Sequence, residues 1–191
     1  MGKLIQTPLM TTDISLYNNS WYETGGSRLK RLTWFYINAC IFNNSLFPIN
    51  QLKIFLLKLF GAKVGRAVVI KPCVNIKYPW NLSIGSYSWI GENVWIDSLV
   101  NISLGNHVCI SQGAYLLTGN HDFKKISFDL IVKKIVVEDG VWIGARSIVC
   151  PGLTCYSHSL LTAGSVATKD LEAYTIYQGN PAIKVKERII E

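Results

Sequence analysis

At 191 residues, the chain is long enough for one domain with a sizeable buried core and a small appendage. Hydrophobic residues make up 49% of it and charged residues only 16%, which excludes a disordered chain. The formal charge of +7 suits phosphates of a small ligand or an anionic membrane surface, and no recognised nucleic-acid-binding motif is present, so we expect no nucleic acid partner.

The start of the chain and its cysteines both indicate a reducing compartment. The opening residues, "MGKLIQTPLM", lack the apolar segment of a secretory signal peptide. The five cysteines are odd in number and show no Cys-x-x-Cys spacing, so we expect small buried hydrophobic residues and neither disulfides nor a zinc site. We therefore expect a cytoplasmic protein.

Residues 28–60 are apolar and basic, and a break at Pro48 predicts two short helices, over 28–42 and 49–60. Neither apolar run reaches the roughly 20 residues that a transmembrane helix needs. We expect residues 1–60 to form an extension, either as a helical cap on the following domain or, compatibly, as a surface that rests at the inner face of an anionic membrane. The side chains available to such a membrane surface are Arg28, Lys30, Arg31, Trp34, Phe35 and Tyr36.

From Val64 onward the dominant period is six residues, which fits neither an amphipathic helix nor simple strand alternation. Such a period is typical of a β-solenoid, in which three short strands close a triangular coil of about 18 residues and stacked coils share one interior. Two intervals of eight residues, 76–84 and 96–104, predict enlarged corners. The aliphatic positions are Val64, Ile70, Ile76, Ile84, Ile90, Ile96, Leu104, Ile110, Leu116, Val137, Ile143, Val149, Cys155, Leu161 and Ala167.

The six-residue period is interrupted by the insertion 118–134, which begins with "TGNHDF". His121 stands there beside Asp122, in a loop that leaves the coil. The residues alone allow two interpretations, a working side chain or a polar loop residue that bonds to nearby backbone.

The C-terminal segments "VEDGVWIGARSIVCPGLT" and "LLTAGSVATKDLEAYTIYQGNPAIKVKER" resemble the ends of galactoside, maltose and xenobiotic acetyltransferases. The segments "LFGAKVG", "WIGENVWID" and "ISQGAYLLTGNHD" resemble the acetyltransferase group assigned to colanic-acid biosynthesis. The chain is thus similar to the hexapeptide-repeat acyltransferases. The resemblance implies an all-β solenoid, a left-handed parallel β-helix over 61–188, with 118–134 as an extended active-site loop.

In similar enzymes the His on this loop is the catalytic base, which here is His121. A neutral imidazole can take the proton of a sugar hydroxyl as that hydroxyl attacks a thioester, with no covalent enzyme intermediate. Asp97 and Asn93, on the preceding coil, are candidates for orienting the base or the acceptor hydroxyl, or else cap turns. The candidates for contacting the acceptor are Asn120, Asp122 and Trp142.

The resemblance further implies acetyl-CoA as the donor, no metal, a sugar or glycan acceptor from capsular or exopolysaccharide biosynthesis, and a homotrimer whose sites lie between subunits. The basic residues near the C-terminus would meet coenzyme phosphates, or else form a solvated tail. The residues that match the coenzyme positions are Gly144, Ala145, Ala163, Gly164, Thr168 and Lys169, and the basic residues near the C-terminus are Lys184, Lys186 and Arg188.

Three alternatives stay open. The first is N-acetylation of an amino sugar or a nucleotide-linked sugar, and the second is a non-catalytic structural solenoid subunit. The third, hydration of carbon dioxide, needs three His around zinc. The chain has only His107, His121 and His158, and lacks a closely spaced pair on the loop.

Overall fold

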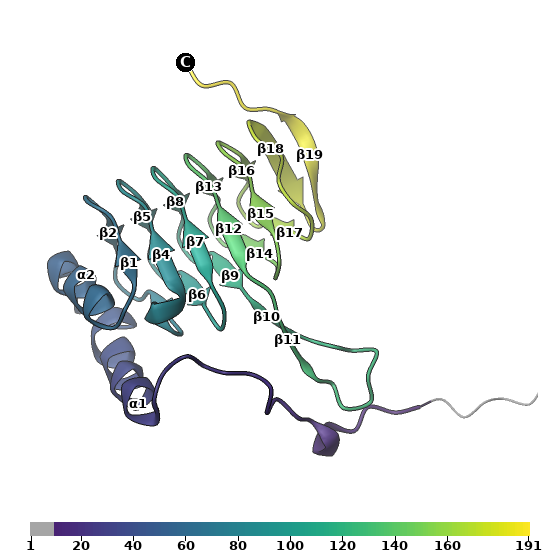
Figure 1. Cartoon of the computed structure of the whole chain (residues 1–191). Helices are drawn as coiled ribbons and strands as arrows, with labels where there is room; N and C mark the ends of the chain where they lie inside the picture. The colour runs from purple at the N-terminus through teal and green to yellow at the C-terminus, as the bar shows by residue number, and fades with distance from the viewer. Residues whose placement is uncertain (1–9) are drawn as a thin grey trace, which may run out of the picture.

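The computed structural model describes residues 10–191, so the first nine residues of the predicted extension lie outside the described part. Its main body is a triangular parallel β-helix with three faces (Figure 1). Face A contains β1 (Lys63–Val64), β4 (Leu82–Ile84), β7 (Ile102–Leu104), β12 (Ile135–Val137) and β15 (Thr154–Cys155). Face B contains β2 (Val69–Ile70), β5 (Trp89–Ile90), β8 (Cys109–Ile110), β13 (Trp142–Ile143), β16 (Leu160–Leu161), β18 (Thr175–Gly179) and β19 (Ala182–Glu187). Face C contains β3 (Asn75–Ile76), β6 (Trp95–Asp97), β9 (Tyr115–Leu117), β14 (Ile148–Val149) and β17 (Val166–Ala167).

The chain passes through faces A, B and C in that order in each coil, and the register confirms the predicted enlarged corners. Ile84 pairs with Leu104, a spacing of 20 residues, whereas Val137 pairs with Cys155, a spacing of 18. The extra residues lie where the chain passes from face C to face A. A short 3-10 helix, Pro79–Asn81, fills the first of these corners.

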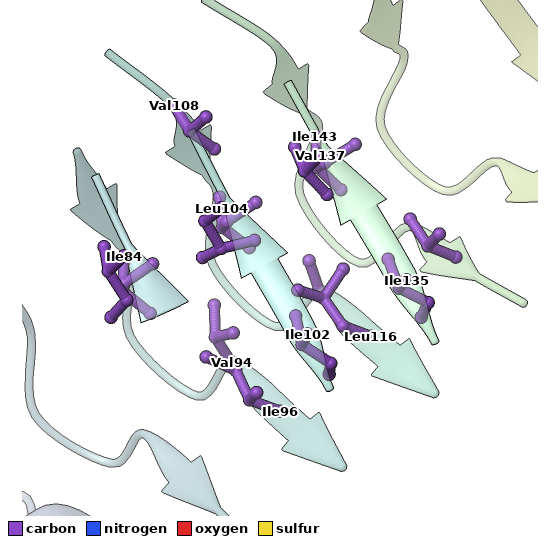
Figure 2. Close-up of a cluster of buried hydrophobic side chains, with 14 of the residues drawn as sticks. Ile84, Val94, Ile96, Ile102, Leu104, Val108, Leu116, Ile135, Val137 and Ile143 are labelled. Carbon is purple, nitrogen blue, oxygen red and sulfur yellow. The ribbon is translucent and has the colours of Figure 1, made fainter. Parts of the chain in front are cut away.

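The predicted aliphatic positions form the interior of the β-helix. All of them are buried except Val64, which lies half-buried in the first strand beside α2 (Asn50–Leu59). Figure 2 shows Ile84, Leu104 and Val137 in a row on successive strands of face A. The hexads thus build one continuous core along the coil axis.

The N-terminal helices cap the open end of the first coil. The predicted first helix is an α-helix, α1 (Arg28–Ile37), that continues as a π-helix, Asn38–Phe42. Asn50 and Asn38 accept hydrogen bonds from the backbone N–H groups of Ile70 and Ile76, at 2.8 and 3.1 Å. These donors sit at the edge of the coil and would otherwise lack a preceding strand. No helix within residues 10–191 has the length and apolar character to cross a bilayer.

The opposite end of the β-helix is closed by the antiparallel hairpin of β18 and β19 (Figure 1). β18 joins face B through its parallel pairing with β16, where Leu160 lies opposite Ile176. The two ends of the coil are therefore covered by different devices, helices at one end and a hairpin at the other.

Candidate active site

The predicted loop is a hairpin that leaves the coil between faces C and A. Its strands are β10 (Gly119–His121) and β11 (Leu130–Val132), paired antiparallel so that His121 lies opposite Leu130. Figure 1 shows it projecting from one edge of the prism. His121 is therefore held on paired backbone, at the end of a two-stranded ribbon.

The geometry of the His121 ring fixes its tautomer. Its Nδ1 lies 2.9 Å from the carbonyl oxygen of Phe128, and its ring stacks on the Phe128 ring at 4.5 Å with an interplanar angle of 5°. A carbonyl oxygen only accepts hydrogen bonds, so Nδ1 carries the proton of the neutral imidazole and Nε2 keeps a free lone pair. The partner of Nδ1 is thus a backbone carbonyl, and the roles of Asp97 and Asn93 in orienting the base or the acceptor hydroxyl stay predictions.

The segment before α1 also reaches His121. The Tyr17 ring lies 5.8 Å from the His121 ring, on a stretch anchored to the loop by the Asp13 backbone N–H, which donates to the carbonyl of Ile126 at 2.9 Å. Farther along, the Tyr22 hydroxyl donates to the carbonyl of Leu99 at 2.7 Å. Sequence reasoning missed Tyr17, because nothing in the local pattern signals a contact across about a hundred residues.

Asp97 ends β6 on face C, beside the base of the hairpin. Its pKa is raised, because burial of the carboxyl outweighs the opposing effects of Lys77 and of the Gly119 backbone N–H. Together with Trp95 and Tyr115 it lines a cavity of 410 Å³ on this face. Asp97 therefore lies near the strand that carries His121, and its role in orienting the acceptor hydroxyl stays a prediction.

Asn93 lies at the other end of β6, on the edge between faces B and C. Its φ of 58° falls in the left-handed region, which Asn tolerates better than most residues. Asp97 lies four positions further along the chain, which corresponds to at most about 13 Å. Within one chain, Asn93 therefore forms a corner turn and is not brought to the hairpin.

The residues that flank His121 stabilise the hairpin. The Asn120 side-chain oxygen accepts from the backbone N–H of His121 at 2.8 Å, and the Asp122 carboxylate accepts from that of Lys124 at 3.1 Å. Trp142 lies on face B, 44% exposed, and its Nε1 donates to the hydroxyl of Ser111 at 2.8 Å. Because face B is opposite the edge that carries the hairpin, a single chain does not bring Trp142 to His121.

The first four predicted coenzyme residues are stacked on the edge between faces B and C. The Gly164 backbone N–H donates to the Ala145 carbonyl at 2.8 Å, and a Cβ on Gly144 would lie 2.5 Å from the backbone nitrogen of Ala163. The packing of successive coils thus already requires glycine at position 144. The small side chains leave backbone groups accessible along this edge, since Ala163 and Gly164 are exposed.

The remaining predicted coenzyme residues are distributed over two regions. Thr168 and Lys169 are exposed just after β17. Lys184 and Lys186 extend from β19, and the ion pair of Lys184 with Glu172, at 2.9 Å, raises the pKa of the lysine. Arg188, in contrast, already forms hydrogen bonds within the chain, since its Nη1 donates to the backbone carbonyls of Gly140 and His158.

The three histidines do not converge. His107 and His158 lie on the edge between faces A and B, on either side of Asp139, whereas His121 is on the hairpin. Among residues 10–191, no three His, Cys, Asp or Glu side chains come together as a metal-binding group.

The chain was compared with known proteins. No protein-family model matches it. It is 39% identical over 165 residues to WcaF of Escherichia coli K12, named as a putative colanic acid biosynthesis acetyltransferase, and the match covers 86% of this chain and 91% of that one. It is 29% identical to the galactoside O-acetyltransferase of the same organism, over 69% of this chain and 66% of the relative.

Solved structures share the fold. The hexapeptide-repeat acetyltransferase VCA0836 of Vibrio cholerae, determined with acetyl-CoA, superimposes with a TM-score of 0.78 at 23% identity, over 88% of this chain and 93% of that one. A galactoside acetyltransferase determined with coenzyme A gives a TM-score of 0.73 at 24% identity, over 83% and 80%. The fold is therefore the left-handed parallel β-helix that the resemblance led us to expect. With the match to WcaF, this shows that the chain belongs to the hexapeptide-repeat acetyltransferases and is an acyltransferase.

Proposed function

We propose that the chain transfers an acetyl group from acetyl-CoA to a hydroxyl group of a sugar or glycan, with His121 as the general base. The observation that carries the proposal is the contact between His121 Nδ1 and the Phe128 carbonyl. It leaves Nε2 unprotonated in the neutral ring, on a hairpin that projects from the coil.

In the proposed reaction, Nε2 of His121 takes the proton of the acceptor hydroxyl while the hydroxyl oxygen attacks the thioester carbonyl. The tetrahedral intermediate collapses with loss of the coenzyme thiolate, which recovers the proton from the imidazolium. Throughout, the Phe128 carbonyl accepts from Nδ1–H and stabilises the positive ring. No covalent bond to the enzyme forms, because both substrates are held in place.

The solved neighbours support acetyl-CoA as the donor, since one was determined with acetyl-CoA and another with coenzyme A. In this chain we assign the pantetheine arm to the edge formed by Gly144, Ala145, Ala163 and Gly164. Thr168 and Lys169 would lie near the adenosine end, and Lys184 and Lys186 would meet the phosphates as point charges.

We further propose a homotrimer whose active sites lie between subunits. Within one chain His121 lies at the edge between faces C and A, whereas Ala163, Asn93 and Trp142 lie on face B or at its edge with face C. A complete site then needs two chains. The arrangement predicts that trimers mixed from inactive His121→Ala and inactive Ala163→Trp chains recover activity, because some interfaces combine two intact halves. Mixed trimers that stay inactive would argue against shared sites.

The names of two relatives, which concern colanic acid biosynthesis and galactosides, support a saccharide acceptor. We propose a unit of a capsular or exopolysaccharide. The test is an acetyl-CoA consumption screen against sugars, amino sugars, nucleotide sugars and glycan repeats, with NMR of the product to distinguish O- from N-acetylation. An N-acetylated product would establish the alternative reaction. Absence of saturable acetyl-CoA binding would instead indicate a structural subunit.

We also propose that the protein acts in the cytoplasm with peripheral membrane contact through residues 28–60. Exposed apolar side chains support the contact, including Leu29, Tyr36 and Phe55, at 73%, 59% and 60% exposure. Flotation with vesicles containing anionic phosphatidylglycerol tests it, with neutral phosphatidylcholine vesicles as the control. The variant carrying Leu29→Glu and Phe55→Glu should lose flotation. Equal flotation of the variant and the unaltered chain would exclude this surface.

A further inference from the structure

A groove runs between α1 and face C on the side of the coil where the hairpin base lies. Its volume is 830 Å³, within the range of sites that bind small organic ligands. The walls combine apolar residues of α1 with the outer side of β3 and β6. The polar and aromatic residues that matter below are Arg28, Arg31, Asn43, Lys77, Tyr78 and Trp95.

The groove is cationic. Arg28, Arg31 and Lys77 line it, and no Asp or Glu does. None of the three forms a salt bridge within residues 10–191, where the ion pairs are Lys125 with Asp129 and Lys184 with Glu172. Because three positively charged side chains line one groove, it favours an anionic ligand with more than one negative charge.

Arg31 gives a second, independent indication. Its Nε is buried and has no hydrogen-bond partner among the described residues. A buried donor without a partner costs free energy, and a small movement of the Arg31 side chain, which lines the groove, would let an oxyanion there satisfy it. The planar guanidinium donates two parallel hydrogen bonds to phosphate, a geometry that a lysine does not offer.

The groove leads toward the catalytic hairpin. Trp95 lines both the groove and the cavity beside Asp97. The Asp97 carboxyl lies by the backbone N–H of Gly119, two residues before His121. A ligand whose anionic part occupied the groove could therefore extend along face C toward the base.

We propose that this groove binds the diphosphate of a diphosphate-linked sugar acceptor, with Arg31 and Lys77 contacting the phosphate oxygens and Tyr78 and Trp95 walling the adjoining sugar. The inference rests on the proposed acetyl transfer and specifies its substrate class. The diphosphate could belong to a nucleoside-diphosphate sugar or to a polyprenyl-diphosphate sugar, and the chemistry that the groove recognises is the same for both.

The first test is calorimetric titration of the full chain with inorganic pyrophosphate. Pyrophosphate should bind saturably, and Arg31→Gln or Lys77→Gln should each weaken binding by about ten- to a hundred-fold. The matched control is Lys58→Gln, which removes the same charge from α2 outside the groove and should leave the dissociation constant unchanged. Lys77 is exposed, so its variant keeps the test valid if Arg31→Gln folds poorly. Absent binding, or binding that the Lys77 variant leaves unaltered, would overturn the proposal.

The second test compares acetyl transfer to an uncharged sugar, a nucleoside-diphosphate sugar and a polyprenyl-diphosphate sugar. The ratio of kcat/KM for the preferred diphosphate acceptor to that for the uncharged sugar should exceed one, and fall about ten-fold or more in Lys77→Gln. Which diphosphate acceptor is preferred identifies the source. A ratio near one overturns the groove assignment and leaves the transferase proposal standing. Pyrophosphate binding that depends on Lys77, together with acetyl transfer that His121→Ala leaves unaffected, would support the groove and overturn the role of His121 as the base.

Discussion

Tyr17→Ala should lower kcat/KM for acetyl transfer without abolishing it. The Tyr17 ring, 5.8 Å from the His121 ring, covers the imidazole in addition to the parallel Phe128 ring at 4.5 Å. An aromatic pair contributes about 0.5–1.5 kcal/mol beyond area burial. If that energy holds the ring in its productive orientation, its loss reduces the competent population, and hence kcat/KM, by about two- to ten-fold.

The assay is steady-state acetyl transfer with Tyr17→Phe as the matched control, since it keeps the ring and removes only the hydroxyl. The Phe variant should behave like the unaltered chain. Two results would refute the reasoning: an Ala variant with unchanged kcat/KM, or one as inactive as His121→Ala. The first would mean that the segment before α1 has no part in positioning the base, and the second that Tyr17 takes part in the chemistry.

Three further predictions concern the coil and its acidic neighbour. Gly85→Ala should greatly destabilise the fold, because the new Cβ would lie 2.4 Å from the backbone of Gly105. Gly164→Ala has open space around the new Cβ and should cost only about 1–2 kcal/mol, because of its φ of 70°. Equal losses of Tm for the two variants in thermal unfolding would contradict this prediction. Leu116→Ala, in the middle of the core, should cost about 2–5 kcal/mol in urea unfolding, and a cost below about 1 kcal/mol would show that the coil collapses around the cavity. Burial raises the pKa of Asp97, so the protonated carboxyl contributes stability at pH values below the ordinary pKa of 3.8. This contribution is lost as the pH rises through the raised pKa of the folded state. Asp97→Asn should therefore raise Tm at neutral pH, and this gain in Tm should shrink toward pH 4. A gain in Tm that grows on acidification would contradict the prediction.

The fold was predictable because the same six-residue pattern, with one inward aliphatic residue, recurs many times along the chain. Each inward aliphatic residue, such as Ile90 or Leu116, can be buried only if the next coil stacks on it, so the pattern specifies the architecture. Even the 20-residue coils follow from the two eight-residue intervals. The helix bounds were predicted to within one residue, since α1 and the π-helix together span 28–42 and α2 spans Asn50–Leu59. The change to a π-helix at Asn38 was not predicted, because it accompanies hydrogen bonds between Asn38 and the first coil that no local pattern indicates.

The site was predictable only in part, for a physical reason. The position of His121 follows from a loop that interrupts a regular repeat. Its partner is a backbone carbonyl of Phe128, placed there by the hairpin, and any residue type supplies such a carbonyl. The contact with Tyr17 joins segments far apart in the chain, as does the groove that unites Arg31 with Lys77. Such juxtapositions depend on tertiary packing and leave no local signal.

The account depends most directly on His121 as the base. The decisive measurement is the single-turnover rate of acetyl transfer by His121→Ala, alongside the dissociation constant for coenzyme A. We predict that the rate falls by about 10²- to 10⁴-fold while coenzyme A binding is unchanged. A folded variant that transfers acetyl groups at a rate near that of the unaltered chain would contradict the account.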